Sequence, residues 1–314
     1  MTPNLNVLLE RVADDIAPHI GTGKVANYIP ALAKIDPGKF GMAIVTPDGQ
    51  ESVYGDADEP FSIQSVSKVF TLTMALNRDG STLWKRVGRE PSGSAFNSVV
   101  QLETEHGIPR NPLINAGALV VTDQLLNGRQ PMTLVEEIVA FMCERARDAS
   151  VGIDREVAWS EARTGARNRA LANFMAGFNN MRSPVEAALD AYFHQCALSL
   201  SCRQLARAGL FFACDGRDPI TKTQVIDRRR CRRINAIMLT CGHYDASGDF
   251  AFKVGLPGKS GVGGGILAIA PGRASIAVWS PGLNEVGNSL AGSHALERIA
   301  KRTGWSVFSA PDQD

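Results

Sequence analysis

Hydrophobic residues recur at helical spacing in some segments of this chain and in short strand-like runs in others. The change between the two patterns divides the chain into regions. Residues 4–20 carry apolar side chains at helical spacing, which predicts an amphipathic opening helix. Two runs of β-like composition follow at 40–46 and 50–54. Pro47-Asp48-Gly49 between them is a strong turn signal, so the two runs predict an antiparallel hairpin.

The middle of the chain, from about residue 79 to residue 245, has almost entirely helical spacing. Clusters of glycine, proline and asparagine divide it into predicted helices at 116–127, 132–147, 166–178, 184–197, 201–213 and 227–240. Strand-like runs return around 250–254, 262–270 and 274–280, before a last helix at about 289–303.

Strands at both ends of a helical middle predict an α+β fold. One antiparallel sheet would be assembled from both chain ends and flanked by the terminal helices. We expect residues 1–78 and 245–314 to form this sheet subdomain and residues 79–244 to form an all-helical subdomain. A cleft between the two is the natural place for an active site.

The charge balance excludes the function classes that depend on a strong net charge. Lys plus Arg total 33 and Asp plus Glu total 32 in 314 residues, so nothing drives general binding to nucleic acid or membranes. The one basic run, residues 228–233, is typical of a solvated helix face or a subunit contact, and we assign it no chemistry.

The compartment and the cofactors are predicted from what the sequence lacks. The six cysteines include no C-x-x-C pair, and no apolar run approaches the roughly 18 residues that span a bilayer. Acidic residues interrupt the apolar pattern of residues 4–20, so we expect no signal peptide and a cytoplasmic protein. The five histidines lack metal spacing and no phosphate or dinucleotide loop occurs, so we expect no metal and no cofactor.

Candidate chemistry begins at Ser65 and Lys68, at the start of a helix predicted to reach about Asn77. Residues three apart project from one helix face, so the serine and the amine can act together. A lysine with its ordinary pKa of about 10.4 is already protonated at neutral pH and cannot serve as a base. Apolar neighbours such as Val66 and Phe70 would lower that pKa by desolvation. Roughly one Ser-x-x-Lys is expected by chance in a chain of this length, so the pair needs support.

That support comes from Lys259-Ser260-Gly261, which is predicted to open a strand. Val262 and three glycines follow, and glycines permit close approach of two backbones. The amides of Val262 and Ser65 could then form the two-donor hole that stabilises an oxyanion. Lys259 would lower the pKa of Lys68 or orient a carboxylate. An isolated glycine run is otherwise typical of a flexible turn.

Ser-x-x-Lys together with a late Lys-Ser-Gly resembles the serine β-lactamases and penicillin-binding proteins. The Ser-Asp-Asn element of those enzymes is absent from this chain. Longer stretches resemble the signature blocks of the serine-dependent glutaminases, which share that fold. The blocks lie at 61–68, 111–118, 160–161 with 167–172, 238–242 with 244–248, and 259–265.

The resemblance to glutaminases implies a role for each matched residue. It implies Ser65 as nucleophile and Lys68 as its base, and a dimer or tetramer, with a homotetramer as our prediction. The glutamine contacts that it implies are Asn115, Glu161, Asn168, Tyr192, Tyr244 and the Val262 amide, with Tyr28 on a loop over the pocket. We also predict Lys259 as a substrate-binding residue.

The chemistry of glutamine agrees with these residues. Its ammonium needs a carboxylate, which Glu161 would supply, and its carboxylate needs amide or hydroxyl donors. Attack by Ser65 would release ammonia and leave a γ-glutamyl ester for water to hydrolyse. Lys68, Tyr192 or Tyr244 could protonate the ammonia, and the sequence does not choose among them. The alternatives are another Ser-Lys acyl transferase, a Ser-His pair, or a binding module without catalysis.

Overall fold

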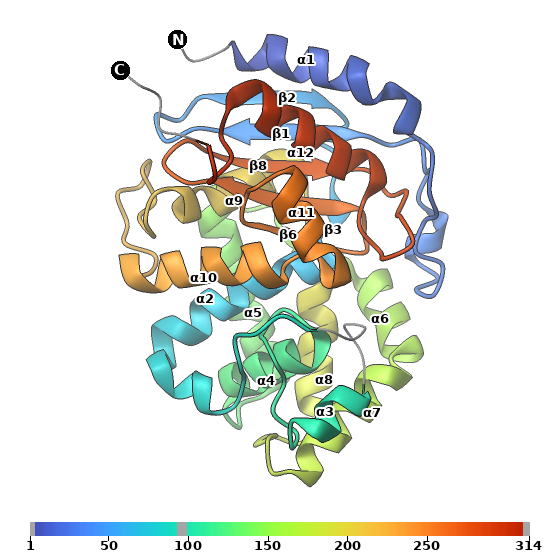
Figure 1. The fold of residues 1–314 in the computed structure, drawn as a ribbon. Coiled ribbons are helices and arrows are strands. Elements are labelled where there is room, and N and C mark those ends of the chain that lie inside the picture. The colour runs from blue at the N-terminus through green and yellow to red at the C-terminus, as the bar shows by residue number, and fades with distance from the viewer. Residues whose placement is uncertain (1–3, 93–98, 310–314) are drawn as a thin grey trace.

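The computed structural model describes residues 4–92 and 99–309 (Figure 1). Its larger sheet is antiparallel with the strand order β2-β1-β8-β7-β6. The strands are β1 (Gly41–Val45), β2 (Glu51–Gly55), β6 (Gly258–Ser260), β7 (Gly265–Ala270) and β8 (Ala274–Trp279). The predicted hairpin of β1 and β2 is confirmed, and so is the sheet assembled from both chain ends.

Both faces of the central strands are buried. Along a strand, successive side chains point to opposite faces. Met42, Ile44 and Ile276 therefore pack with α1 (Leu5–Ile16) and α12 (Leu290–Thr303). The intervening residues, such as Ala43 and Ala277, belong to the main core on the other face.

The second face of the sheet is covered by α9 (Cys202–Ala213), which contacts β1, β7 and β8. Our sequence-based division into subdomains assigns this helix to the helical subdomain, although it packs on the sheet. The subdomain boundaries at residues 78 and 245 stay a prediction. Ser201 caps the helix by accepting the amide of Gln204, whose side chain accepts the amide of Ser201 in return.

Beyond α9 lies α2 (Ser67–Asp79), which crosses the middle of the molecule between the sheet and the remaining helices (Figure 1). Nearly all of its residues from Ser67 to Leu76 are buried. Burial on all sides means that its neighbours enclose the helix, including polar residues such as Lys68. The other helices are α3 (Val99–Thr104), α4 (Asn115–Leu126), α5 (Pro131–Ala146), α6 (Arg155–Thr164), α7 (Ala166–Gly177), α8 (Val185–Cys196), α10 (Arg228–Cys241) and α11 (Ser247–Lys253).

The predicted strand at 250–254 is wrong, because most of this segment belongs to α11. A strand would place Phe250, Phe252 and Val254 on one face. A helix instead brings residues i and i+4 together. Phe250 and Val254 are buried at 6% and 3% exposure, whereas Phe252 is 89% exposed. The apolar residues of this short run fit both the two-residue period of a strand and the period of a helix, and packing against the sheet selects the helix.

The segment 262–270, predicted as one strand, is part turn and part strand in the structure. Lys259 and Ser260 end the separate strand β6, residues 261–264 form a turn, and β7 begins at Gly265. The sequence also gave no prediction for α3, α6 or a small sheet of order β3-β5-β4. Its strands are β3 (Phe61–Ser62), β4 (Gly152–Ile153) and β5 (Leu198–Leu200), too short for a recognisable period.

Two further expectations concern cysteines and membranes. All six cysteines are free thiols. Among the described residues, no helix has the length and apolar character needed to cross a membrane.

Candidate active site

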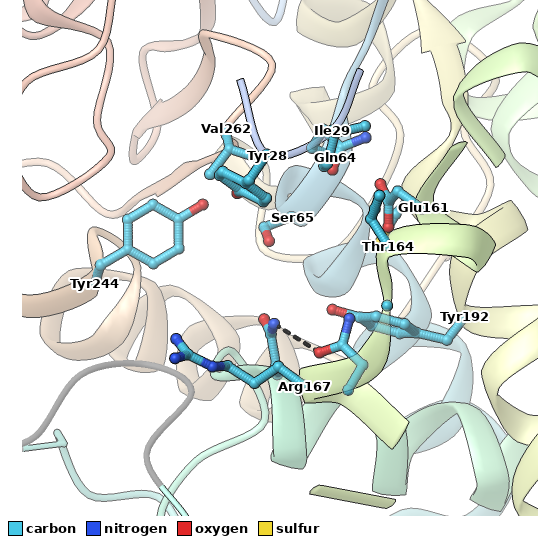
Figure 2. Close-up of a pocket in the computed structure, with 14 residues that line it drawn as sticks. Tyr28, Ile29, Gln64, Ser65, Glu161, Thr164, Arg167, Tyr192, Tyr244 and Val262 are labelled. Atoms are coloured by element: carbon cyan, nitrogen blue, oxygen red, sulfur yellow. Dashed lines mark hydrogen bonds between the residues drawn. The ribbon is translucent and has the colours of Figure 1, made fainter. Parts of the chain in front are cut away.

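A cavity of about 460 Å³ opens between the turn after β6, the 3₁₀ turn that precedes α2, and the helices α6, α7 and α8 (Figure 2). Its wall includes eight predicted site residues, which are Tyr28, Ser65, Asn115, Glu161, Asn168, Tyr192, Tyr244 and Val262. They come from segments spread over most of the chain. Lys68 and Lys259 do not line the cavity and lie behind its wall.

Ser65 lies in a 3₁₀ turn, Gln64–Val66, that leads directly into α2. The preceding residue, Gln64, has a φ of +50° although it is not glycine. Such a backbone costs free energy and persists only where surrounding contacts impose it. Gln64 is buried at 3% exposure, and its amide donates to the Ser62 hydroxyl at 2.9 Å. The sharp turn leaves the Ser65 side chain facing the cavity (Figure 2).

The turn after β6 packs directly against the Ser65 segment. A Cβ on Gly261 would lie 2.4 Å from the carbonyl oxygen of Ile63 and 3.3 Å from the Ser65 nitrogen. Only glycine permits this approach, and it brings Val262 into the cavity wall. Within the described chain, neither the Ser65 amide nor the Val262 amide donates to another protein group. Two backbone donors are therefore available at the nucleophile.

Lys68 is enclosed below Ser65, with 1% of its side chain exposed. Its Nζ donates to the Leu113 carbonyl at 3.2 Å and to Asn115 Oδ1 at 2.7 Å. Among the described residues, none of its hydrogen bonds goes to the Ser65 hydroxyl. Burial lowers the pKa of Lys68 to about 8, and the electrostatic interactions of the amine with Cys196 and Glu161 oppose the shift. The predicted desolvation of this amine is thus present.

The loop before α4 holds the acceptors of Lys68 in place. Asn111 Oδ1 accepts the amides of Leu113 and Ile114. Gly117 makes this loop possible, since a Cβ there would lie 1.8 Å from the Asn111 carbonyl oxygen. Asn115 then connects Lys68 to the far wall, because its Nδ2 donates to Asn168 Oδ1 at 3.0 Å.

Glu161 is a buried carboxylate on α6, with 6% exposure. Burial raises its pKa to about 7, and the Gln64 amide and the charge of Lys68 oppose the rise. Its Oε1 is buried and has no hydrogen-bond partner. Because a buried polar atom normally has a partner, the cavity favours a ligand that brings a donor to this oxygen.

Three tyrosines surround the remaining space. Tyr244 has a φ of +55°, and its hydroxyl donates to the Ser260 carbonyl at 3.2 Å. Burial raises the pKa of Tyr244, and a hydrogen bond from Ser65 opposes the rise. Tyr192 is 2% exposed, and burial also raises its pKa. Tyr28 is 55% exposed and lies over the cavity close to Val262 (Figure 2).

Lys259 is fully buried behind Tyr244. Its Nζ donates to the carbonyls of Gly242 at 3.0 Å and Ser260 at 2.5 Å, and it lies 4.5 Å from the centre of the Tyr244 ring. Burial and the charge of Lys68 lower the pKa of Lys259. Its contacts hold the backbone on which Tyr244 and Ser260 sit.

Comparison with known proteins identifies the family. The glutaminase family model matches residues 23–308. The chain belongs to the glutaminase family. It is 62% identical over 303 residues to a glutaminase of Agrobacterium fabrum, covering 96% of this chain and 98% of that protein. It is 64% identical over 305 residues to a thermolabile glutaminase of Rhizobium etli, covering 97% and 99%.

The fold of this family member also matches solved glutaminases. A probable glutaminase from Bacillus subtilis, complexed with 6-diazo-5-oxo-L-norleucine, is 35% identical with a TM-score of 0.88. The match covers 98% of each chain. The similarity therefore includes both the sheet and the helical part.

Six lining residues were absent from our sequence-based site: Ile29, Gln64, Thr164, Gly165, Arg167 and Cys196. Gln64 and Arg167 lie within signature blocks of the glutaminase family, directly before Ser65 and Asn168. Their position in those blocks was the available signal. Cys196 had none, because a cysteine in an apolar helix is most often a small core residue.

Proposed function

We propose that this glutaminase hydrolyses L-glutamine through an acyl-enzyme on Ser65, with Lys68 as the base. The observation that carries the proposal is one arrangement of groups. Ser65 lies beside two unbonded amides, a lysine of lowered pKa is buried behind it, and a buried carboxylate faces it across the cavity. These are the parts that acyl transfer from a zwitterionic amino acid requires.

In the proposed complex, the substrate ammonium pairs with Glu161 Oε1. The side-chain amide then reaches Ser65, and its carbonyl oxygen accepts the amides of Ser65 and Val262. Asn168 and the hydroxyls of Tyr28 and Tyr192 provide neutral donors along the cavity. Tyr28, which is half exposed, would close over the bound ligand.

Chemistry begins when neutral Lys68 removes the Ser65 proton. The serine oxygen attacks the amide carbon, and the oxyanion forms between the two backbone donors. Ammonia then leaves with a proton from Lys68 or a tyrosine. Tyr244 is favoured over Tyr192 for this role because it has the hydrogen bond with Ser65. Water finally hydrolyses the ester and releases glutamate.

Glu161→Gln tests the glutamine-specific part of the proposal. The change keeps the shape of the side chain but leaves the substrate ammonium without its counter-charge. The value of kcat/KM should therefore fall, and the fall should correspond to a loss of roughly 2–5 kcal/mol of transition-state binding free energy. An analogue that lacks the α-amino group should be a poor substrate of the wild type and lose little further in the variant.

Measuring kcat/KM for both substrates on both proteins gives a coupling free energy for the Glu161–ammonium contact. A coupling near zero would make Glu161 a structural acid. The matched control is Glu156→Gln, because Glu156 lies on the same helix, exposed and paired with Lys34 outside the cavity.

The pH dependence of kcat/KM should rise through two ionisations. Lys68 must be neutral, so its contribution increases as the pH passes about 8. Glu161 must be ionised, so its contribution increases as the pH passes about 7. Activity should therefore fall with a slope of one below pH 8 and approach a slope of two below pH 7. Stopped assays from pH 5.5 to 9.5 measure the profile, and a flat profile across this range would contradict the assignment of Lys68.

The finer predictions from sequence remain proposals. They are a β-lactamase-like relation of the fold, a cytoplasmic location, and a homo-oligomer, either a dimer or a tetramer.

Parallel assays of ammonia release from glutamine and asparagine, and of the hydrolysis of a chromogenic β-lactam, distinguish the glutaminase from other Ser-Lys acyl transferases.

A further inference from the structure

A second cavity, of about 400 Å³, shares the side chain of Tyr244 with the catalytic cavity. It lies between the end of α10, the start of α11 and the loop before α4. The apolar residues that line it include Leu113, Ile114, Leu239, Ala251 and Phe308. Among the described residues of its wall, Asp245 is the only charged one. The reaction above assigns no role to this space.

The groups that can protonate the leaving ammonia lie on the wall between the two cavities. Lys68 Nζ donates to Asn115, which lines the catalytic cavity, and to the carbonyl of Leu113, which lines the second one. Tyr244 lines both, and its hydroxyl points into the catalytic cavity toward Ser65 (Figure 2). Ammonia is therefore formed directly beside the second cavity.

The ring of Tyr244 is the barrier between the two spaces. In a close-packed interior a ring has little freedom, because any displacement meets neighbouring atoms. Tyr244 instead has open space on two sides. Its backbone is held separately, since the Ser247 hydroxyl donates to the Tyr244 carbonyl at 3.0 Å. The ring can therefore move aside for a molecule as small as ammonia while the backbone stays in place.

The proposed reaction has a need for a second way out. While the γ-glutamyl ester remains on Ser65, it occupies the catalytic cavity, and Tyr28 lies over that cavity. Ammonia that stays can attack the ester and re-form glutamine. Neutral ammonia can cross an apolar space, whereas the charged glutamyl group cannot enter it without a large desolvation cost. The carboxylate of Asp245, which is exposed, also repels glutamate and attracts ammonium.

We propose that ammonia leaves past Tyr244 through the second cavity while the γ-glutamyl group is still bound to Ser65. The bond between carbon and nitrogen breaks as the nitrogen takes up the proton that Lys68 removed from Ser65, either directly or through Tyr244. Ammonia departs as a neutral molecule, and Lys68 is neutral again before water attacks the ester. The inference rests on the proposed function and adds a separate exit for its first product.

Ala251→Phe and Gly248→Phe test the route, because both fill the second cavity and neither residue lines the catalytic one. A Cβ added at Gly248 meets no atom within 4 Å, and Ala251 is partly exposed, so the larger side chains can be accommodated. Gly177→Phe is the matched control. Gly177 is also a helical glycine with open space beside it, but it lies at the end of α7 and lines neither cavity.

The measurement is hydrolysis of unlabelled glutamine in isotopically labelled ammonium chloride. Label found in the remaining glutamine reports ammonia that reached the ester, and glutamate reports water that reached it. The ratio of label incorporation to glutamate formation should fall by a factor on the order of ten in both narrowed variants, because passage of ammonia is slowed. A general structural defect would lower both rates together and leave their ratio unchanged. Gly177→Phe should match the wild type.

An unchanged ratio in both narrowed variants would overturn the proposal. So would an equal fall in Gly177→Phe, or a wild type that hydrolyses glutamine without incorporating label, because a passage that releases ammonia also admits it. The proposed function fails separately, if Ser65→Ala keeps its turnover. Loss of turnover in Ser65→Ala with an unchanged ratio in the narrowed variants would refute the exit route alone.

Discussion

Ser65→Ala is expected to lower kcat for glutamine by a factor on the order of 10⁴ or more, the loss seen when a nucleophile is removed from a concerted unit. Without the hydroxyl no γ-glutamyl ester can form. The oxyanion donors and Glu161 remain, so the variant should still bind glutamate. Ammonia release measured over hours, with calorimetric binding of glutamate, tests both halves of this expectation.

The control for this variant is Ser67→Ala. The Ser67 side chain is fully buried and accepts from Gln195 at 3.3 Å, away from the cavity. Its loss should cost about 1 kcal/mol of stability, the typical value of one hydrogen bond, and leave turnover near that of the wild type. If Ser65→Ala kept more than a tenth of wild-type turnover, Ser65 could not be the nucleophile.

Lys68→Arg should be nearly as severe. A guanidinium keeps the positive charge but cannot release its proton at working pH, so no base is present to activate Ser65. Burial, which lowers the pKa of the lysine to about 8, cannot bring an arginine into that range. The measurement is kcat from pH 7 to pH 9.5, where the wild type gains activity and the variant should not.

Because the site of Lys68 is fully enclosed, Lys68→Met serves as a second variant that removes the charge and the base together. Thermal unfolding of both variants shows whether the fold is retained. The sequence left open a Ser-His pair, for which we take His194 as the candidate base; it hydrogen bonds the Asp190 carbonyl and does not line the cavity. His194→Gln should therefore keep its activity. An active Lys68→Arg would move the base elsewhere and make His194 the next residue to test.

The sequence by itself determined what depends on short-range spacing. The Pro47-Asp48-Gly49 turn specifies the β1–β2 hairpin, because its residues favour the backbone angles that a turn requires. The three-residue spacing places Ser65 and Lys68 on consecutive turns of one segment. Most helices follow from a period of 3.6 over ten or more residues, which few other structures tolerate.

Only the tertiary structure decided what depends on contacts between distant segments. Residues 250–254 fit both periods, and packing against the sheet made them helical with Phe252 outside. The sequence predicts Lys259 as a site residue, but in the structure its amine is buried behind Tyr244 and donates to backbone carbonyls. The lowered pKa of Lys68 and the raised pKa of Glu161 arise from desolvation, which local spacing cannot specify because the enclosing walls come from remote parts of the chain.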